Sequence, residues 1–130
     1  MNRPVTPTRI RAPFAAYSHG ILVPPGARLL FCSGQLGVAP DDRVPEDVEA
    51  QAVLCFENIK AILAEAGMSF ADVVRYNGFV TDRAHFPIYG RVRSRYAQGD
   101  AFASTLVVVA GFTRPEFKVE VEVTAARAER

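Results

Sequence analysis

The sequence predicts a single α+β domain in which two helices cover one face of a β-sheet. The chain has 130 residues, which is a usual length for one domain. Short apolar runs typical of strands alternate with two longer stretches that have the three- and four-residue spacing of amphipathic helices. One apolar run, 106–109, does not alternate with polar residues, as expected of a strand that is buried on both faces.

The first part of the chain is expected to hold an irregular arm and then a hairpin. Residues 1–12 are rich in proline and arginine, and no regular element is expected there. Two apolar runs flank Pro24-Pro25-Gly26, which is a strong turn signal. We therefore predict two paired strands, Ile21–Val23 and Arg28–Ser33, joined by this turn.

Two helices and three more strands follow. Pro45 fits the first turn of a helix whose apolar face continues to Ala66, and Gly67 is its natural stop. Residues 73–81 are β-branched and aromatic, which predicts a strand, and Asp82 can cap the next helix. The remaining elements are a helix with its apolar face at Phe86, Tyr89, Val92 and Tyr96, and strands at 105–110 and 117–125.

The predicted order is therefore β-β-α-β-α-β-β, in a single sheet. Two helices cover only one face of such a sheet, whereas the apolar strand 106–109 needs cover on both faces. Because the chain offers no third layer, we expect another copy of the same chain to supply it. Packing alone thus predicts a homo-oligomer.

Composition argues against several classes of protein. Fifteen basic and fourteen acidic residues leave a formal charge of +1, so no nucleic-acid partner is expected. No apolar run approaches the roughly 20 residues of a membrane span, and the first residues lack a secretory pattern, so we expect a cytoplasmic protein without a membrane partner. Cys32 and Cys55 lie in apolar runs and are expected to be buried, reduced thiols. His19 and His85 are far apart and have no ligand spacing, so no metal is expected.

Two groups of charged residues have open interpretations. Glu120 and Glu122 alternate with valines, so they share one face of the last strand. They either decorate a solvated face, or one of them is an acid/base group in a subunit cleft, where burial raises its pKa. Arg91, Arg93 and Arg95 on the second helix are more typical of a solvated face than of an RNA contact.

Five segments together resemble the reactive intermediate deaminase family, also called RidA or YjgF. They are PFAAYSHG at 13–20, FCSGQ at 31–35, DVEAQ and ENIKA within 47–61, FVTD at 79–82, and VEVEV at 119–123. The resemblance covers about residues 12–127 in the family's order. It implies a chorismate-mutase-like fold assembled as a homotrimer with three clefts between subunits. It also implies hydrolysis of enamines and imines such as 2-aminoacrylate, with no metal or organic cofactor.

The resemblance also implies which residues form the site. Glu120 is at the position of the glutamate that helps water attack the imine carbon, and Tyr17 is at the position of the pocket tyrosine. The segment Ser33-Gly34-Gln35 would shape the same pocket.

This sequence departs from the family in one segment of that pocket. Ala103 occupies the position of the family's carboxylate-binding arginine, and Ser104 and Thr105 complete the segment that we assign to substrate binding. Small side chains cannot reproduce the two parallel hydrogen bonds of a guanidinium, so we expect a substrate other than 2-aminoacrylate. Gly90 replaces a frequent asparagine, and Arg114 in the longer loop 111–116 is a candidate substitute cation.

Two functions therefore remain open from the sequence. The first is a RidA-like enamine/imine hydrolase that acts on a small reactive metabolite. The alternative is a non-catalytic or regulatory trimer that binds a small metabolite in the same clefts. A ribonuclease role is disfavoured by the near-neutral charge and by the lack of a paired-histidine arrangement.

Overall fold

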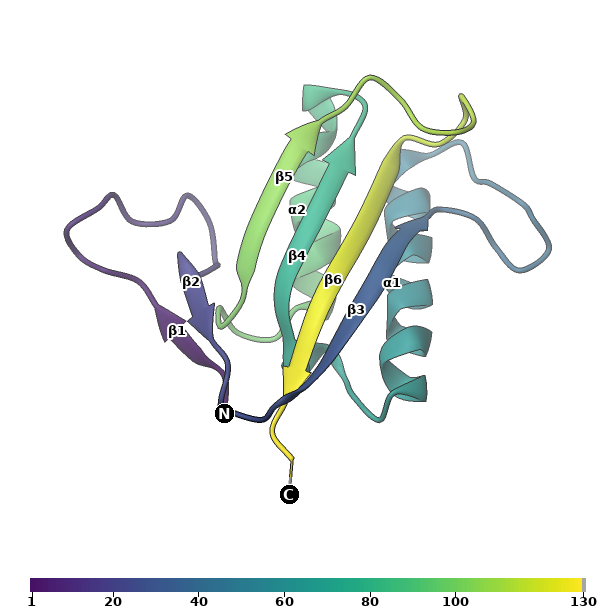
Figure 1. Cartoon of the computed structure of the whole chain (residues 1–130). Coiled ribbons are helices and arrows are strands. Elements are labelled where there is room, and N and C mark those ends of the chain that lie inside the picture. Colours follow the sequence, from purple (N-terminus) through teal and green to yellow (C-terminus); the bar gives the residue numbers. More distant parts are fainter. Residues whose placement is uncertain (130) are drawn as a thin grey trace.

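The computed structural model describes residues 1–129, and its main sheet has four strands in the order β3-β6-β4-β5 (Figure 1). β6 is antiparallel to both of its neighbours, whereas β4 and β5 are parallel and are connected through the helix α2 (Phe86–Tyr96). β5 is therefore an edge strand. The strand bounds are Arg28–Leu36 for β3, Val73–Val80 for β4, Ala103–Val108 for β5 and Val119–Arg127 for β6.

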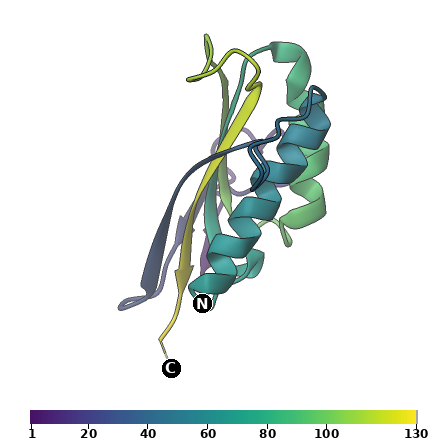
Figure 2. The same cartoon turned by 90° about the vertical axis from the view of Figure 1, so that its right-hand side faces the viewer.

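Both helices, α1 (Val48–Glu65) and α2 (Phe86–Tyr96), lie on the same face of this sheet, as predicted (Figure 2). The fully buried Phe56 of α1 stacks on Tyr96 of α2 at a centroid distance of 5.2 Å, which joins the helices to each other. Against the sheet, the same ring packs on Tyr76 of β4 at 6.1 Å. Neither helix in the described part of the chain is long and apolar enough to cross a membrane.

Side-chain caps decide where the helices begin. Asp47 caps α1 by accepting a hydrogen bond of 3.0 Å from the backbone N–H of Ala50, so Pro45 lies before the helix and not in its first turn. Asp82 caps the 3₁₀ turn Arg83–His85, which leads directly into α2. The predicted element order of the remaining chain is confirmed.

The N-terminal part differs from the prediction. β1 (Arg3–Val5) and β2 (Gly20–Leu22) form a separate antiparallel ribbon, so the arm 1–12 contains a strand and the main sheet lacks β2. The predicted hairpin between 21–23 and 28–33 is wrong, although its turn exists: Ala27 N–H donates to the Pro24 carbonyl at 3.2 Å, and Gly26 has a φ of 73°. A positive φ at this position is typical of a type II turn, which splays its flanking strands instead of pairing them.

The sheet face away from the helices carries exposed apolar side chains. Phe31 is 74% exposed, and Leu29 on the same strand is 52% exposed. Val107 of the apolar strand β5 is 40% exposed. Within one chain, β5 is therefore covered on one side only, and its burial by another copy stays a prediction.

Candidate functional site

The segment Ser33-Gly34-Gln35 lies at a β-bulge in β3. Cys32 pairs with Val123 of β6, whereas Gln35 pairs with Val121, so β3 holds one extra residue at this point. The Gln35 side chain folds back and donates from Nε2 to the Ser33 carbonyl at 3.1 Å. A bulge leaves its extra residue unpaired and redirects nearby side chains, which makes it a common device next to active sites.

Glu120 lies directly over this bulge. A Cβ at Gly34 would be 2.7 Å from both Cδ and Oε2 of Glu120, closer than real Cβ contacts allow. Only glycine therefore admits the carboxylate at this place. The structure thus brings two sequence-predicted site residues, Glu120 and Gly34, into direct contact.

The two glutamates of β6 share one face, as predicted, but their environments differ. The valines that alternate with the two glutamates point into the core; they are Val119, Val121 and Val123. Burial raises the pKa of Glu120 above its usual value, and the negative charge of Glu122 raises that pKa further. Glu122 instead accepts a hydrogen bond of 3.0 Å from Nδ2 of Asn77. The raised pKa of Glu120 favours uptake of a proton by its carboxylate, as a general base requires.

A row of polar side chains continues from Glu122 across the same sheet face. Asn77 of β4 also accepts a hydrogen bond of 2.9 Å from Nε of Arg75. Nη2 of Arg75 in turn donates to Oγ1 of Thr105 on β5 at 2.8 Å. Thr105, which the sequence assigned to the substrate site, is thus linked to the glutamate pair through side chains.

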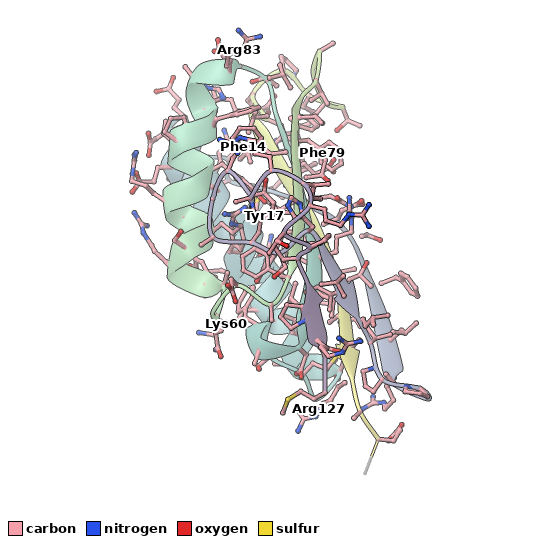
Figure 3. All side chains as sticks on the ribbon, turned by 90° about the vertical axis from the view of Figure 1, so that its left-hand side faces the viewer. Phe14, Tyr17, Lys60, Phe79, Arg83 and Arg127 are labelled. Atoms are coloured by element: carbon pink, nitrogen blue, oxygen red, sulfur yellow. The ribbon has the colours of Figure 1, made fainter. Side chains whose placement is uncertain are left out.

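Tyr17 lies elsewhere, on the N-terminal segment where it passes beside α2 (Figure 3). Its hydroxyl accepts a hydrogen bond of 3.2 Å from the backbone N–H of Phe14. The buried Ser18 fixes this segment to the approach to β5, because its backbone N–H donates to the Phe102 carbonyl at 2.8 Å and its hydroxyl donates to the Asp100 carbonyl at 2.6 Å. The position of Tyr17 is thus set by these two hydrogen bonds of Ser18 to the segment just before β5.

Tyr17 and Ser104 line one cavity of about 390 Å³ between the N-terminal segment, α2 and the edge strand β5. Ser104 points toward this cavity, whereas its neighbours Ala103 and Thr105 alternate to the opposite face of the strand. The cavity is lined by Phe14, Ala15, Tyr17, Phe86, Tyr89, Gly90, Arg93, Ser104 and Leu106.

The predicted site residues therefore form two groups within one chain. Glu120 and the bulge belong to the open sheet face, and Thr105 connects to the same face. Tyr17 and Ser104 line the cavity beside α2, whose walls include neither Glu120 nor the bulge. Within one chain, the two groups therefore do not line a common cavity.

Arg93 lines the cavity beside α2, so the predicted solvated face is wrong for this residue. It is only 8% exposed, and its Nη1 donates to Oγ of Ser104 at 2.8 Å. Arg91 and Arg95 are exposed and both pair with Glu49, so they fit the earlier interpretation. The signal was present in the spacing, because Arg93 follows Tyr89 by four residues and therefore lies on the apolar side of the helix.

Arg114, the candidate substitute cation, already has partners. Its Nη2 lies 2.9 Å from Oε2 of Glu116, and its Nη1 lies 3.6 Å from Oδ1 of Asp42. The guanidinium also covers the ring of Phe117 at 4.7 Å. Its charge is thus met by Glu116 of its own loop and by Asp42 of the loop before α1, and it does not line the cavity beside α2.

Neither cysteine has the properties of a nucleophile. Both are buried and free. Burial raises the pKa of the Cys32 thiol, and burial together with the charge of Glu120 raises the pKa of Cys55 to about 12. Both thiols therefore stay protonated at neutral pH. Across residues 1–129, no three His, Cys, Asp or Glu side chains gather in a way that could hold a metal ion.

Comparisons with known proteins agree with this architecture. The chain is 38% identical over 111 residues to protein DfrA of Myxococcus xanthus, covering 84% of this chain and 83% of that protein. It is 34% identical over 104 residues to the Escherichia coli protein named reactive intermediate deaminase TdcF, covering 77% and 80%. A crystal structure of TdcF with bound serine superimposes with a TM-score of 0.73 at 31% identity, covering 97% of this chain and 99% of TdcF.

A Yersinia pestis Rid-family protein, YyfB, has the same fold, with a TM-score of 0.83 at 24% identity and coverage of 97% and 98%. The family model described as Endoribonuclease L-PSP matches residues 8–127, almost the whole chain. The chain therefore belongs to the Endoribonuclease L-PSP family, which is the YjgF/RidA family whose resemblance was noted in the sequence.

Proposed function

We propose that this protein hydrolyses the imine or enamine of a small reactive metabolite, releasing ammonia and a carbonyl compound. The observation that carries the proposal is the Glu120 carboxylate, held over Gly34 with its pKa raised by burial and by Glu122. The relationship to a protein named reactive intermediate deaminase supports the same reaction.

The chemistry needs little more than a placed carboxylate and a water. The protonated imine carbon is already electrophilic, so the water oxygen bonds to it while Glu120 takes a proton from that water. Glu120 then passes this proton to the nitrogen. As the C–N bond breaks, ammonia leaves, and the hydroxyl group on the carbon gives its proton to Glu120 as the carbonyl forms. Glu120 releases that proton to solvent. Positioning and proton transfer of this kind require no metal or organic cofactor.

The reaction site is proposed to lie between subunits of a homotrimer, where the Glu120 face of one chain meets the Tyr17 cavity of the next. Exposed apolar side chains such as Phe31 and Val107 on the open sheet face support this assembly. Light scattering of the purified protein at micromolar concentration should give the mass of three chains. A mass near the 14.2 kDa of one chain would contradict it.

The substrate is proposed to differ from 2-aminoacrylate, because Ala103 cannot hold a carboxylate as an arginine at that position would. Ammonia release should be measured with a panel of imines generated enzymatically from different amino acids. We expect turnover of at least one member and weak turnover of 2-iminopropanoate. Strong turnover of 2-iminopropanoate would contradict the substrate expectation, and no turnover of any member would contradict the hydrolase itself.

The alternative is a non-catalytic trimer that binds a small metabolite in the same clefts. The loss of an arginine at Ala103 favours it, and the structure of TdcF with bound serine is an example of a relative holding a small molecule. Ligand binding without ammonia release from any imine would favour this function.

We propose no nucleic-acid partner and a cytoplasmic location. The two exposed arginines of α2, Arg91 and Arg95, both pair with the carboxylate of Glu49, which offsets part of their positive charge and supports the first proposal. Two buried free thiols support a reducing compartment.

A further inference from the structure

The guanidinium of Arg93 is a buried charge without a counter-ion. Within residues 1–129 no carboxylate lies within 4.0 Å of it, whereas the neighbouring Arg91 and Arg95 both reach Glu49. Its one hydrogen bond goes to a neutral hydroxyl, Oγ of Ser104, and its Nε is buried with no hydrogen-bond partner. Burying an unpaired cation is costly, so a site of this kind indicates an anion that the chain itself does not provide.

The position of this guanidinium is fixed before any ligand arrives. Arg93 lies over the rings of Phe102 at 5.3 Å and Tyr89 at 5.9 Å, and Ser104 holds Nη1 at 2.8 Å. Contacts of this kind restrict a long side chain to one orientation. A charged donor that is already oriented binds its partner without the entropic cost of ordering it.

Arg93 lines a cavity that suits a small organic anion. Its volume is about 390 Å³, within the range of small-molecule sites, and most of its walls are apolar. Phe14, Phe86 and Leu106 supply those walls, while Tyr17 and Ser104 add hydroxyl groups. Gly90 is one turn before Arg93, and nothing lies within 4 Å of the place where its Cβ would be, so the space in front of the helix stays open.

Arg93 also lies close to the segment that lacks the expected arginine. Ala103 and Ser104 are adjacent on β5, and Arg93 bonds to Ser104 from the helix side. We propose that Arg93 binds the carboxylate of the substrate, a small organic acid with an apolar side chain, in place of an arginine at Ala103. The carboxylate then lies against α2, with the apolar side chain among Phe14, Phe86 and Leu106.

This inference rests on the proposed function for what happens to the ligand, but binding can be measured without turnover. The probe is 4-methyl-2-oxopentanoate, a stable keto acid of the kind that imine hydrolysis would release, compared by calorimetry with its neutral amide. The intact wild-type protein should bind the acid at least about 30-fold more tightly than the amide, as expected when a buried charge finds its partner. Equal binding of acid and amide, or binding of neither, would overturn the proposal.

Matched variants test whether Arg93 is the positive charge that binds the acid. Arg93→Met should weaken binding of the acid by about 30-fold or more, and Arg93→Lys should lose less, because it keeps the charge but not the planar fork. Arg91→Met removes the same charge from the exposed side of the same helix and should stay within about threefold of wild type. Acid binding by Arg93→Met equal to wild type would refute the assignment. If that variant fails to fold, the acid–amide comparison on the wild-type protein decides.

The two proposals can fail separately. Binding of the keto acid through Arg93 without ammonia release from any imine would refute the hydrolase and leave the carboxylate site standing. Turnover of imines by a protein that binds acid and amide equally would refute the role of Arg93 and leave the hydrolase standing.

Discussion

A methyl group at Gly34 should separate activity from stability. In Gly34→Ala the new Cβ would lie 2.7 Å from Cδ and Oε2 of Glu120 and 3.0 Å from its Cγ. An ordinary contact begins near 3.4 Å, so the carboxylate must move by at least about 0.7 Å or change rotamer. The clash meets the end of a flexible side chain, which can rotate away, so the free energy of unfolding should fall by no more than about 1.5 kcal/mol. A reacting group displaced by about 1 Å can lose on the order of 10²-fold in rate, so kcat/KM should fall by about that factor, or roughly 2.7 kcal/mol of transition-state stabilisation.

The assay is ammonia release from the best imine of the panel, with chemical denaturation and light scattering on the same samples. Gly111→Ala is the matched control, because a Cβ there meets nothing within 4 Å and Gly111 does not line the cavity beside α2. It should keep the activity and change the free energy of unfolding by no more than about 0.5 kcal/mol, as is usual for an exposed loop position. Full activity in Gly34→Ala would show that the observed contact between Gly34 and the Glu120 carboxylate is not the productive one.

Two further predictions concern pH and folding. Glu122→Gln should lower the pKa of Glu120, because the substitution removes the negative charge of Glu122, which raises that pKa. The acid limb of the pH–rate profile should therefore move to lower pH. An unchanged acid limb would contradict its assignment to Glu120. Gln51→Met should lower the free energy of unfolding, measured by chemical denaturation, by about 3 kcal/mol. The fully buried amide of Gln51 makes hydrogen bonds of 2.8–2.9 Å to three backbone groups, which would lose their partners. A decrease of less than about 1 kcal/mol would contradict this prediction.

Much of the fold could be predicted because local signals agree with the final packing. The helix α1 has both an apolar stripe and a capping aspartate, and the alternating valines of β6 give its buried face. The pairing of β2 could not be predicted, because a strand of three residues carries too little pattern to choose its partner. Tertiary contacts to Arg3–Val5 make that choice.

The site was predictable only in part. That Glu120 and Glu122 share one face follows from the two-residue alternation of side chains along a strand. The contact of Glu120 with Gly34 depends on a β-bulge in β3, which no sequence pattern predicts. Arg93 was misassigned because three alternating arginines look like one charged run. On a helix, residues two apart point to different sides, so Arg93 turns inward while Arg91 and Arg95 meet Glu49.

The most direct test of the account replaces the carboxylate of Glu120 with an amide of nearly the same shape. Glu120→Gln cannot accept the proton of the attacking water, so turnover of the best imine should fall by roughly 10²–10⁴-fold, while the mass of the assembly stays unchanged. Glu122→Gln is the control on the same strand face, and at the pH optimum it should keep activity within about threefold of wild type. Equal losses in both variants, or no loss in Glu120→Gln, would contradict the role assigned to Glu120.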